Sequence, residues 1–99
     1  MSEHMMKLVE DMWEELEGAK HYAEMAVANK GIDGIKTGVY GDMAKQELTH
    51  FENLHKLAAQ ELSSHKGEEH HAAQMVWDWE HGKMMRRAAK IRAMLDMAK

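Results

Sequence analysis

The stretch AKQELTHFENLHKL, residues 44–57, contains no glycine or proline, and its apolar residues recur every three or four positions. This spacing gathers them on one side of an α-helix and therefore predicts a helix. Glu47 lies within the apolar stripe, and His50 lies near its edge. A helix that turns a carboxylate and an imidazole toward its own buried side needs a chemical reason to do so.

Two polar segments that contain glycine flank this helix: NKGIDG at 29–34 and SSHKG at 63–67. They separate three segments with helical periodicity, at about residues 4–29, 35–62 and 68–98. Short connections between long helices favour antiparallel neighbours. We therefore predict an all-α fold, an antiparallel three-helix chain that forms a single helical domain over residues 1–99.

The composition limits the chemistry available to the chain. Its 99 residues suit one domain with a modest core, which oligomerisation would enlarge. The absence of cysteine excludes disulfides and thiol chemistry, and the absence of proline fits long uninterrupted helices. Eleven methionines can fill an irregular core, and eight histidines can serve as metal ligands, proton carriers or ordinary polar residues.

The charge distribution gives no reason to expect nucleic-acid binding. The formal net charge is −4 at pH 7, and no part of the chain is strongly basic. The opening residues MSEHMMKLVEDMW lack a long apolar run, and no stretch approaches the roughly 20 apolar residues of a membrane span. We expect a soluble, cytoplasmic protein.

Each helical segment has an apolar stripe, identified by assigning about 100° of rotation to each residue. In the first segment the stripe comprises Leu8, Met12, Leu16, Ala19, Ala23 and Ala26. In the second it comprises Met43, Ala44, Phe51, Leu54, Leu57, Ala58 and Leu62. In the third it comprises Ala73, Val76, Trp77, Met84, Ala88, Ile91, Leu95 and Ala98. We expect Trp13, Trp77 and Trp79 to anchor the core or an interface.

Every stripe also contains one acid. Glu15 lies within the first stripe and Glu47 within the second, while Glu80 lies near the centre of the third and is flanked by His81. His50 follows Glu47 by three residues, so these two side chains project the same way. The inward faces of the three helices therefore offer carboxylates and at least one imidazole.

Three inward carboxylates cost free energy, because each loses its hydration. No inward Lys or Arg lies at the same height along the helices to neutralise them. Either a raised pKa keeps the carboxyls protonated, or a bound cation supplies positive charge. Carboxylate oxygen with imidazole nitrogen suits iron, manganese or zinc. We interpret Glu15, Glu47, His50 and Glu80 as candidate metal ligands. The alternative for each is a boundary residue whose polar end reaches water, and for His81 we favour that alternative.

The stretches EELEGAKHYAEMA (14–26) and AKQELTHFENL (44–54) resemble the first two helices of the ferritin-like superfamily, above all rubrerythrins and the short encapsulated ferritins. In those families one helix carries a metal-binding Glu seven residues before a Tyr, and a second helix carries Glu-x-x-His. Here Glu15 stands seven residues before Tyr22, and a Glu-x-x-His motif begins at Glu47.

The resemblance implies that Glu15, Glu47 and His50 are ligands and that Tyr22 lies near the site. A full ferritin-like chain has four helices and two Glu-x-x-His motifs, whereas this chain has three helices and one well-placed motif. In the short encapsulated ferritins two chains pair, and each supplies half of a di-iron site. By that analogy the chain forms a homodimer or higher homo-oligomer, completes a larger helix bundle and holds iron between its copies.

Two functions follow from these patterns. The first is a di-metal, di-iron protein with ferroxidase activity or activity toward oxygen or peroxide. The second is a non-enzymatic helical adaptor that binds an acidic partner or phosphate through the run RRAAKIR, residues 86–92. Its cations are Arg86, Arg87, Lys90 and Arg92. Cations near a helix C-terminus also have an ordinary explanation, because the helix dipole favours them there.

Overall fold

The computed structural model describes residues 3–64 and 66–99, so His65 of the predicted second turn lies outside the described residues. Three helices, α1 (Glu3–Asn29), α2 (Gly34–Ser64) and α3 (Gly67–Ala98), account for nearly all of them. The described residues contain no strand, which confirms the all-helical prediction and places the two breaks where glycine predicted them.

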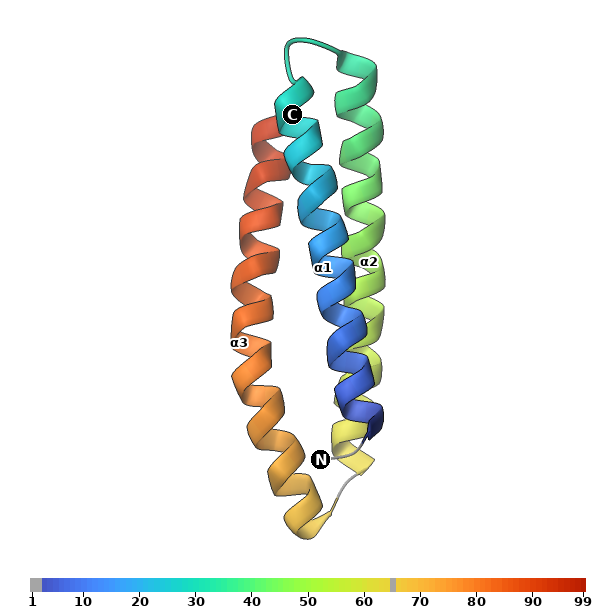
Figure 1. The fold of residues 1–99 in the computed structure, drawn as a ribbon, viewed down its shortest axis with the longest axis vertical. Helices are drawn as coiled ribbons and strands as arrows, with labels where there is room; N and C mark the ends of the chain where they lie inside the picture. Colours follow the sequence, from blue (N-terminus) through green and yellow to red (C-terminus); the bar gives the residue numbers. More distant parts are fainter. Residues whose placement is uncertain (1–2, 65) are drawn as a thin grey trace.

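The three helices lie side by side in an elongated molecule with extents of 55 × 17 × 15 Å (Figure 1). In Figure 1 the chain rises through α1, descends through α2 and rises again through α3, so that its C-terminus lies beside the end of α1. The α1 helix packs most extensively against α2, and α2 and α3 share the smallest of the three interfaces. We refer to the α1 and α2 pair as the α1–α2 hairpin.

Local chemistry explains the turn of this hairpin. Gly31 has a φ of 78°, a left-handed conformation that glycine adopts without steric cost, and it ends α1. The backbone N–H groups of Ile32 and Asp33 then donate to the Asn29 carbonyl at 3.0 and 2.9 Å. The Asp33 carboxylate accepts from the Lys36 N–H at 3.0 Å and caps the start of α2. The short turn fixes which residues of α1 and α2 lie opposite each other.

Most of the core lies on the predicted stripes, but Met5 of α1, outside its stripe, is also buried, and α2 differs at two leucines. The buried apolar residues are Met5, Met12, Leu16, Ala19, Ala23, Ala26, Ala44, Leu48, Phe51, Ala58, Ala73, Trp77, Met84, Ala88, Ile91 and Leu95. Leu57, predicted to be buried, is 50% exposed, whereas Leu48, left out of the stripe, is 6% exposed. The reason is that α3 packs on the Leu48 side of α2 and leaves the Leu57 side uncovered. Trp77 is buried, and Trp79 is 68% exposed.

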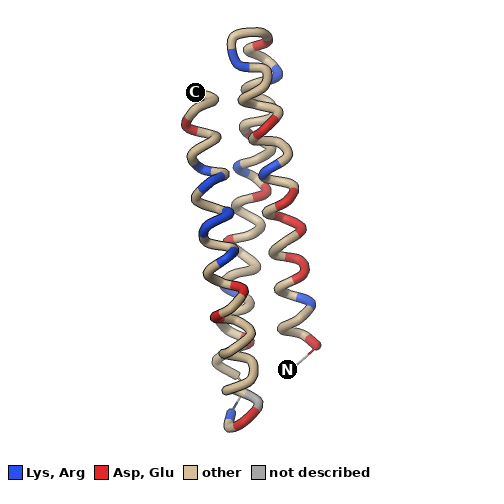
Figure 2. Tube along the Cα trace, turned by 60° about the vertical axis from the view of Figure 1, so that its left-hand side comes forward, with Lys and Arg blue, Asp and Glu red and all other residues tan. Residues whose placement is uncertain are grey.

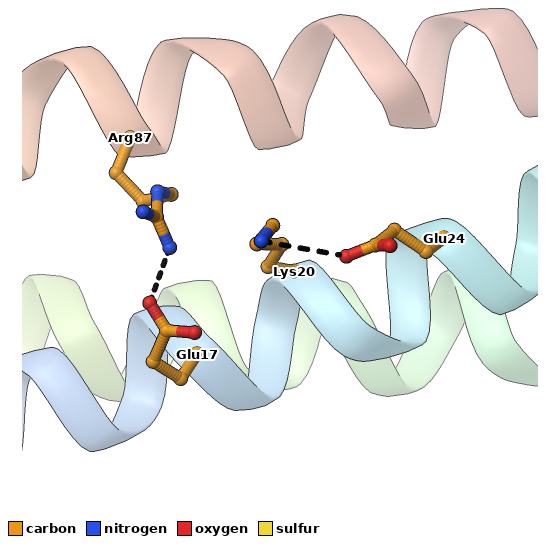
Figure 3. Close-up of polar contacts among 4 residues, drawn as sticks. All are labelled: Glu17, Lys20, Glu24 and Arg87. Atoms are coloured by element: carbon orange, nitrogen blue, oxygen red, sulfur yellow. Dashed lines mark hydrogen bonds and ion pairs between the residues drawn. The ribbon is translucent and has the colours of Figure 1, made fainter.

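Polar contacts attach α3 to the other two helices. Arg87 forms an ion pair with Glu17 of α1 (Figure 3), and Arg92 forms one with Glu52 of α2 at 3.1 Å. The Trp13 Nε1–H of α1 also donates to the Glu80 carboxylate of α3 at 2.9 Å. Figure 2 shows the underlying distribution of charge, with cations grouped along α3 and acids along α1. These contacts place α3 on one side of the α1–α2 hairpin.

Candidate metal centre

Glu15 of α1 and both Glu47 and His50 of α2 come together between the helices of the hairpin. One potential ligand atom from each residue lies within 4.8 Å of the others, and among the described residues no other group of three such side chains does so. The His50 Nδ1 lies 3.4 Å from the Glu15 Oε2. Glu15 precedes Glu47 and His50 by more than 30 residues in sequence, yet the three form one cluster, which we call the triad.

The Glu15 carboxylate is largely buried, and one of its oxygens makes no hydrogen bond among the described residues although His50 lies 3.4 Å away. Its side chain is only 26% exposed, and the oxygen without a hydrogen bond is Oε2. A buried oxygen that makes no hydrogen bond costs free energy of about 1–3 kcal/mol, and more when it carries charge. A bound cation would recover that energy, so this atom fits a metal ligand.

Gly18 makes the room in which the Glu47 carboxylate lies. An added Cβ at Gly18 would stand 3.1 Å from the Glu47 Oε2, tighter than an ordinary van der Waals contact, so the carboxylate would have to shift by a few tenths of an ångström. Gly18 is one turn after Glu15 on α1, so the two carboxylates share the same short section of the helix surface. Sequence reasoning missed Gly18, although a glycine inside a long helix, where it costs about 1 kcal/mol relative to alanine, is itself a signal.

The charges in the triad perturb one another. Hydrogen bonding to the Glu15 side chain raises the pKa of Glu47 above its ordinary value. Burial and the charge of Glu15 raise this pKa further, and the charge of His50 opposes them. A carboxyl with a raised pKa lacks cationic neighbours sufficient to hold its negative charge. The triad therefore carries negative charge that its own residues do not fully compensate, and a bound cation would stabilise it.

The triad lies on the side of the hairpin opposite α3. Glu15 and Glu17 are two positions apart, so their side chains point about 200° apart on α1, and Glu17 contacts Arg87 of α3. His50 and Glu52 are related in the same way on α2, and Glu52 contacts α3 through its ion pair with Arg92. The His50 side chain is 56% exposed. The α3 helix thus leaves the triad accessible from outside.

Two tyrosines stack on the same side of the hairpin. Tyr22 follows Glu15 by seven residues, Tyr40 precedes Glu47 by seven, and their rings stack with centroids 6.2 Å apart. Seven residues correspond to about 10.5 Å along a helix, so the stacked rings lie about two turns from the carboxylates. Tyr22 thus lies on the triad side of α1 about two turns from Glu15, and Tyr40 was not anticipated.

Glu80 is not brought to the triad. Its carboxylate accepts the 2.9 Å hydrogen bond from Trp13 and lies 3.8 Å from the Lys83 ammonium. These two partners satisfy the inward acid of α3 without a metal. His81, which we expected at the boundary, is half-buried and pairs instead with His55.

The chain was compared with protein-family models, with curated proteins and with solved structures, and none of them matches it. Any assignment of function therefore comes from the residues themselves. No helix in the described parts of the chain has both the length and the apolar character needed to cross a bilayer.

Proposed function

We propose that the chain is a ferritin-like di-metal carboxylate protein that binds iron between two copies of itself. Each copy would contribute Glu15, Glu47 and His50. The observation that carries the proposal is the triad, whose ligand atoms lie within 4.8 Å of one another and include a buried Glu15 oxygen that no described residue hydrogen-bonds. Carboxylate oxygen with imidazole nitrogen suits iron, with manganese or zinc as alternatives.

The open face of the hairpin supports pairing of two copies. One triad supplies two carboxylates and one imidazole, too few for two metal ions, and two triads supply four carboxylates and two imidazoles. Leu57 is seven residues after His50 on α2 and is 50% exposed, so apolar surface adjoins the triad. A second copy related by a two-fold axis would cover that surface and complete the helix bundle.

Each residue of the triad has a distinct task in this proposal. Glu15 would offer its buried oxygen as an anionic ligand, and Glu47 would offer the carboxylate that Gly18 accommodates. His50, at the exposed end of the triad, would be a terminal nitrogen ligand. Iron held there would supply one-electron redox chemistry, with Fe(II) oxidation by oxygen or peroxide as the reaction. Glu80 is left out, because Trp13 and Lys83 already hold its carboxylate.

The adaptor alternative has weaker support. Of its four cations, Arg87 and Arg92 are used in ion pairs that attach α3 to the hairpin. Arg86 and Lys90 make no ion pair among the described residues, and both are exposed. They line a shallow pocket of about 300 Å³ beside Trp13 that could receive an anion.

Metal analysis of protein purified without a histidine tag tests the proposal. After anaerobic reconstitution with Fe(II), we expect about one iron per chain in the wild type and a large loss in Glu47→Ala. The mass in solution should correspond to a dimer or larger assembly. Aerobic addition of Fe(II), followed by ferric absorbance, then measures oxidation.

Arg86→Ala is the matched control, because it removes an exposed charge from α3 and leaves the triad intact. It should retain full iron content. Iron, manganese and zinc all remaining well below one per chain after reconstitution would refute the proposal. Salt-sensitive binding of an acidic protein that disappears in Arg86→Ala would support the adaptor instead.

A further inference from the structure

A second pair of imidazoles joins α2 to α3, away from the triad. The Nε2 atoms of His55 and His81 lie 3.2 Å apart, and their ring centroids are separated by 5.2 Å. Without a metal, one Nε2–H donates to the lone pair of the other Nε2, which requires the two rings to be different tautomers. Both rings are half-buried and come from different helices. Their relative position is therefore set by the fold.

The buried Trp77 indole holds this pair in place. Its ring centroid lies 5.4 Å from that of His55 and 5.1 Å from that of His81. Trp77 is 8% exposed and precedes His81 by one turn of α3, so the indole forms a rigid floor beneath both imidazoles. Ligands held by packing lose little conformational entropy when they bind a metal.

The nitrogen separation matches a metal site as well as a hydrogen bond. Two nitrogen ligands of a tetrahedral zinc ion, with Zn–N distances of about 2.05 Å, lie about 3.3 Å apart. The observed 3.2 Å is within about 0.1 Å of this separation, so the two nitrogens are already spaced for a cation that displaces the shared proton. We propose that His55 and His81 form a bis-histidine site for a borderline divalent cation such as zinc.

The chemistry of the pair selects this class of cation. Imidazole nitrogen suits zinc, copper and nickel, whereas magnesium and calcium require oxygen ligands. Glu52, three residues before His55, is held by Arg92 and is not free to act as a third ligand. His55 also lines an open pocket of about 320 Å³ with Glu52, Lys56 and Arg92, so waters that complete the coordination of a cation can reach His55 from that side.

Such a cation would join two helices that otherwise have little contact. The α2–α3 interface is the smallest of the three in the molecule. A cation bound only by the folded arrangement stabilises it, and the gain grows with metal concentration. The site would therefore clip α3 onto the hairpin independently of the triad.

Zinc titration of the double variant Glu47→Gln/His50→Gln tests the proposal, since this background removes the triad. Calorimetry should show one zinc per chain, and the thermal unfolding midpoint should rise by several degrees in excess zinc. Added His55→Gln or His81→Gln should each weaken zinc binding by about tenfold or more and abolish the thermal shift. Added His71→Gln, which removes an exposed histidine of α3, should change neither.

A measurement without further substitution guards against variants that fail to fold. In the same background, nitrogen NMR should show that the Nε2 resonances of both His55 and His81 shift at one equivalent of zinc. Absence of zinc binding in the background protein would overturn the proposal. Zinc affinity that either histidine substitution leaves unchanged, or zinc binding that leaves either Nε2 resonance unmoved, would overturn it as well.

Discussion

The carboxylate of Glu47 lies against the side of Gly18 where a side chain would project, with its Oε2 atom 3.1 Å from the position of an added Cβ. An absent methyl group on α1 thus positions a charged group of α2. The price of this arrangement is a glycine in the middle of a helix. A substitution at Gly18 should therefore change metal binding and helix stability in different directions, which can be measured.

Gly18→Ala should weaken metal binding without destabilising the protein. Alanine favours a helix by about 1 kcal/mol over glycine, which offsets the displacement of a partly exposed Glu47 side chain. We expect iron or manganese affinity to fall at least several-fold, while the free energy of urea unfolding stays the same or rises. Gly41→Ala is the matched control, because apart from its own stretch of helix no described residue comes within 4 Å of its added Cβ. It should raise stability and leave metal binding unchanged.

Glu47→Gln should make the metal-free protein more stable while abolishing metal binding. The pKa of Glu47 in the folded protein is raised above its ordinary value near 4.5. The folded protein therefore holds more protons than the unfolded chain just above pH 4.5, and stability falls as pH rises through that window. A neutral amide removes this loss. We expect a gain of roughly 0.5–1 kcal/mol at pH 7, typical of relieved surface repulsion.

Urea unfolding of metal-free protein at pH 4 and pH 7 measures this effect. The advantage of Glu47→Gln should be larger at pH 7 than at pH 4, where the wild-type carboxyl is increasingly protonated. Glu24→Gln changes an exposed acid of α1 that pairs with Lys20 (Figure 3) and should give no such gain. A destabilised Glu47→Gln at pH 7 would show that the carboxylate is already neutralised within the chain.

The His55–His81 pair should make the metal-free protein sensitive to mild acid. Burial, followed by the proximity of His81, lowers the pKa of His55 below its ordinary value near 6.5. The unfolded chain then binds more protons below pH 6.5, so stability is lost as pH falls through 6.5 and levels off below the folded pKa. Glu52, Lys56 and Arg92 line the same pocket, and the ion pair of Glu52 with Arg92 limits their net charge beside His55.

Unfolding free energies measured from pH 7.5 to pH 5 in the presence of a chelator should therefore decline. His55→Gln should flatten this decline, and the exposed His71→Gln should leave it unchanged. An identical slope in the wild type and in His55→Gln would contradict the assigned origin of the acid sensitivity.

Glu80 should prove to be a structural acid. Trp13→Phe removes the hydrogen bond that the indole donates to the Glu80 carboxylate and should cost about 1–2 kcal/mol of unfolding free energy. Glu80→Gln keeps an acceptor for Trp13 and should leave the metal content of reconstituted protein unchanged. Glu15→Gln is the comparison and should lose most of the metal. Loss of metal in Glu80→Gln would return this residue to the ligand set.

Local pattern in the sequence was enough to predict the three helices, whereas the choice of Glu15, Glu47 and His50 without Glu80 came from the family resemblance. Glycines at the two breaks and apolar residues three or four apart define the three helices, because both features act within one helix. A short turn also makes consecutive helices face each other. Residues on their facing sides, such as Glu15 on one helix and Glu47 and His50 on the next, can therefore be expected to lie close together.

Contacts of α3 could not be predicted in the same way. The exposure of Leu57 depends on which side of α2 receives α3, and periodicity does not contain that information. Glu80 is satisfied by Trp13, a partner 67 residues away, and His55 meets His81 across 26 residues. These pairings depend on how one helix packs on another. The periodicity of a single helix does not specify that packing.

The placement of α3 has a consequence for how the molecule responds to its solution. Its links to the hairpin include exposed ion pairs, among them Arg92 with Glu52, and added electrolyte screens such charges. The Glu15 oxygen that faces the other way is shielded from bulk water. Rising ionic strength should therefore loosen one flank of this protein while the opposite flank keeps its geometry.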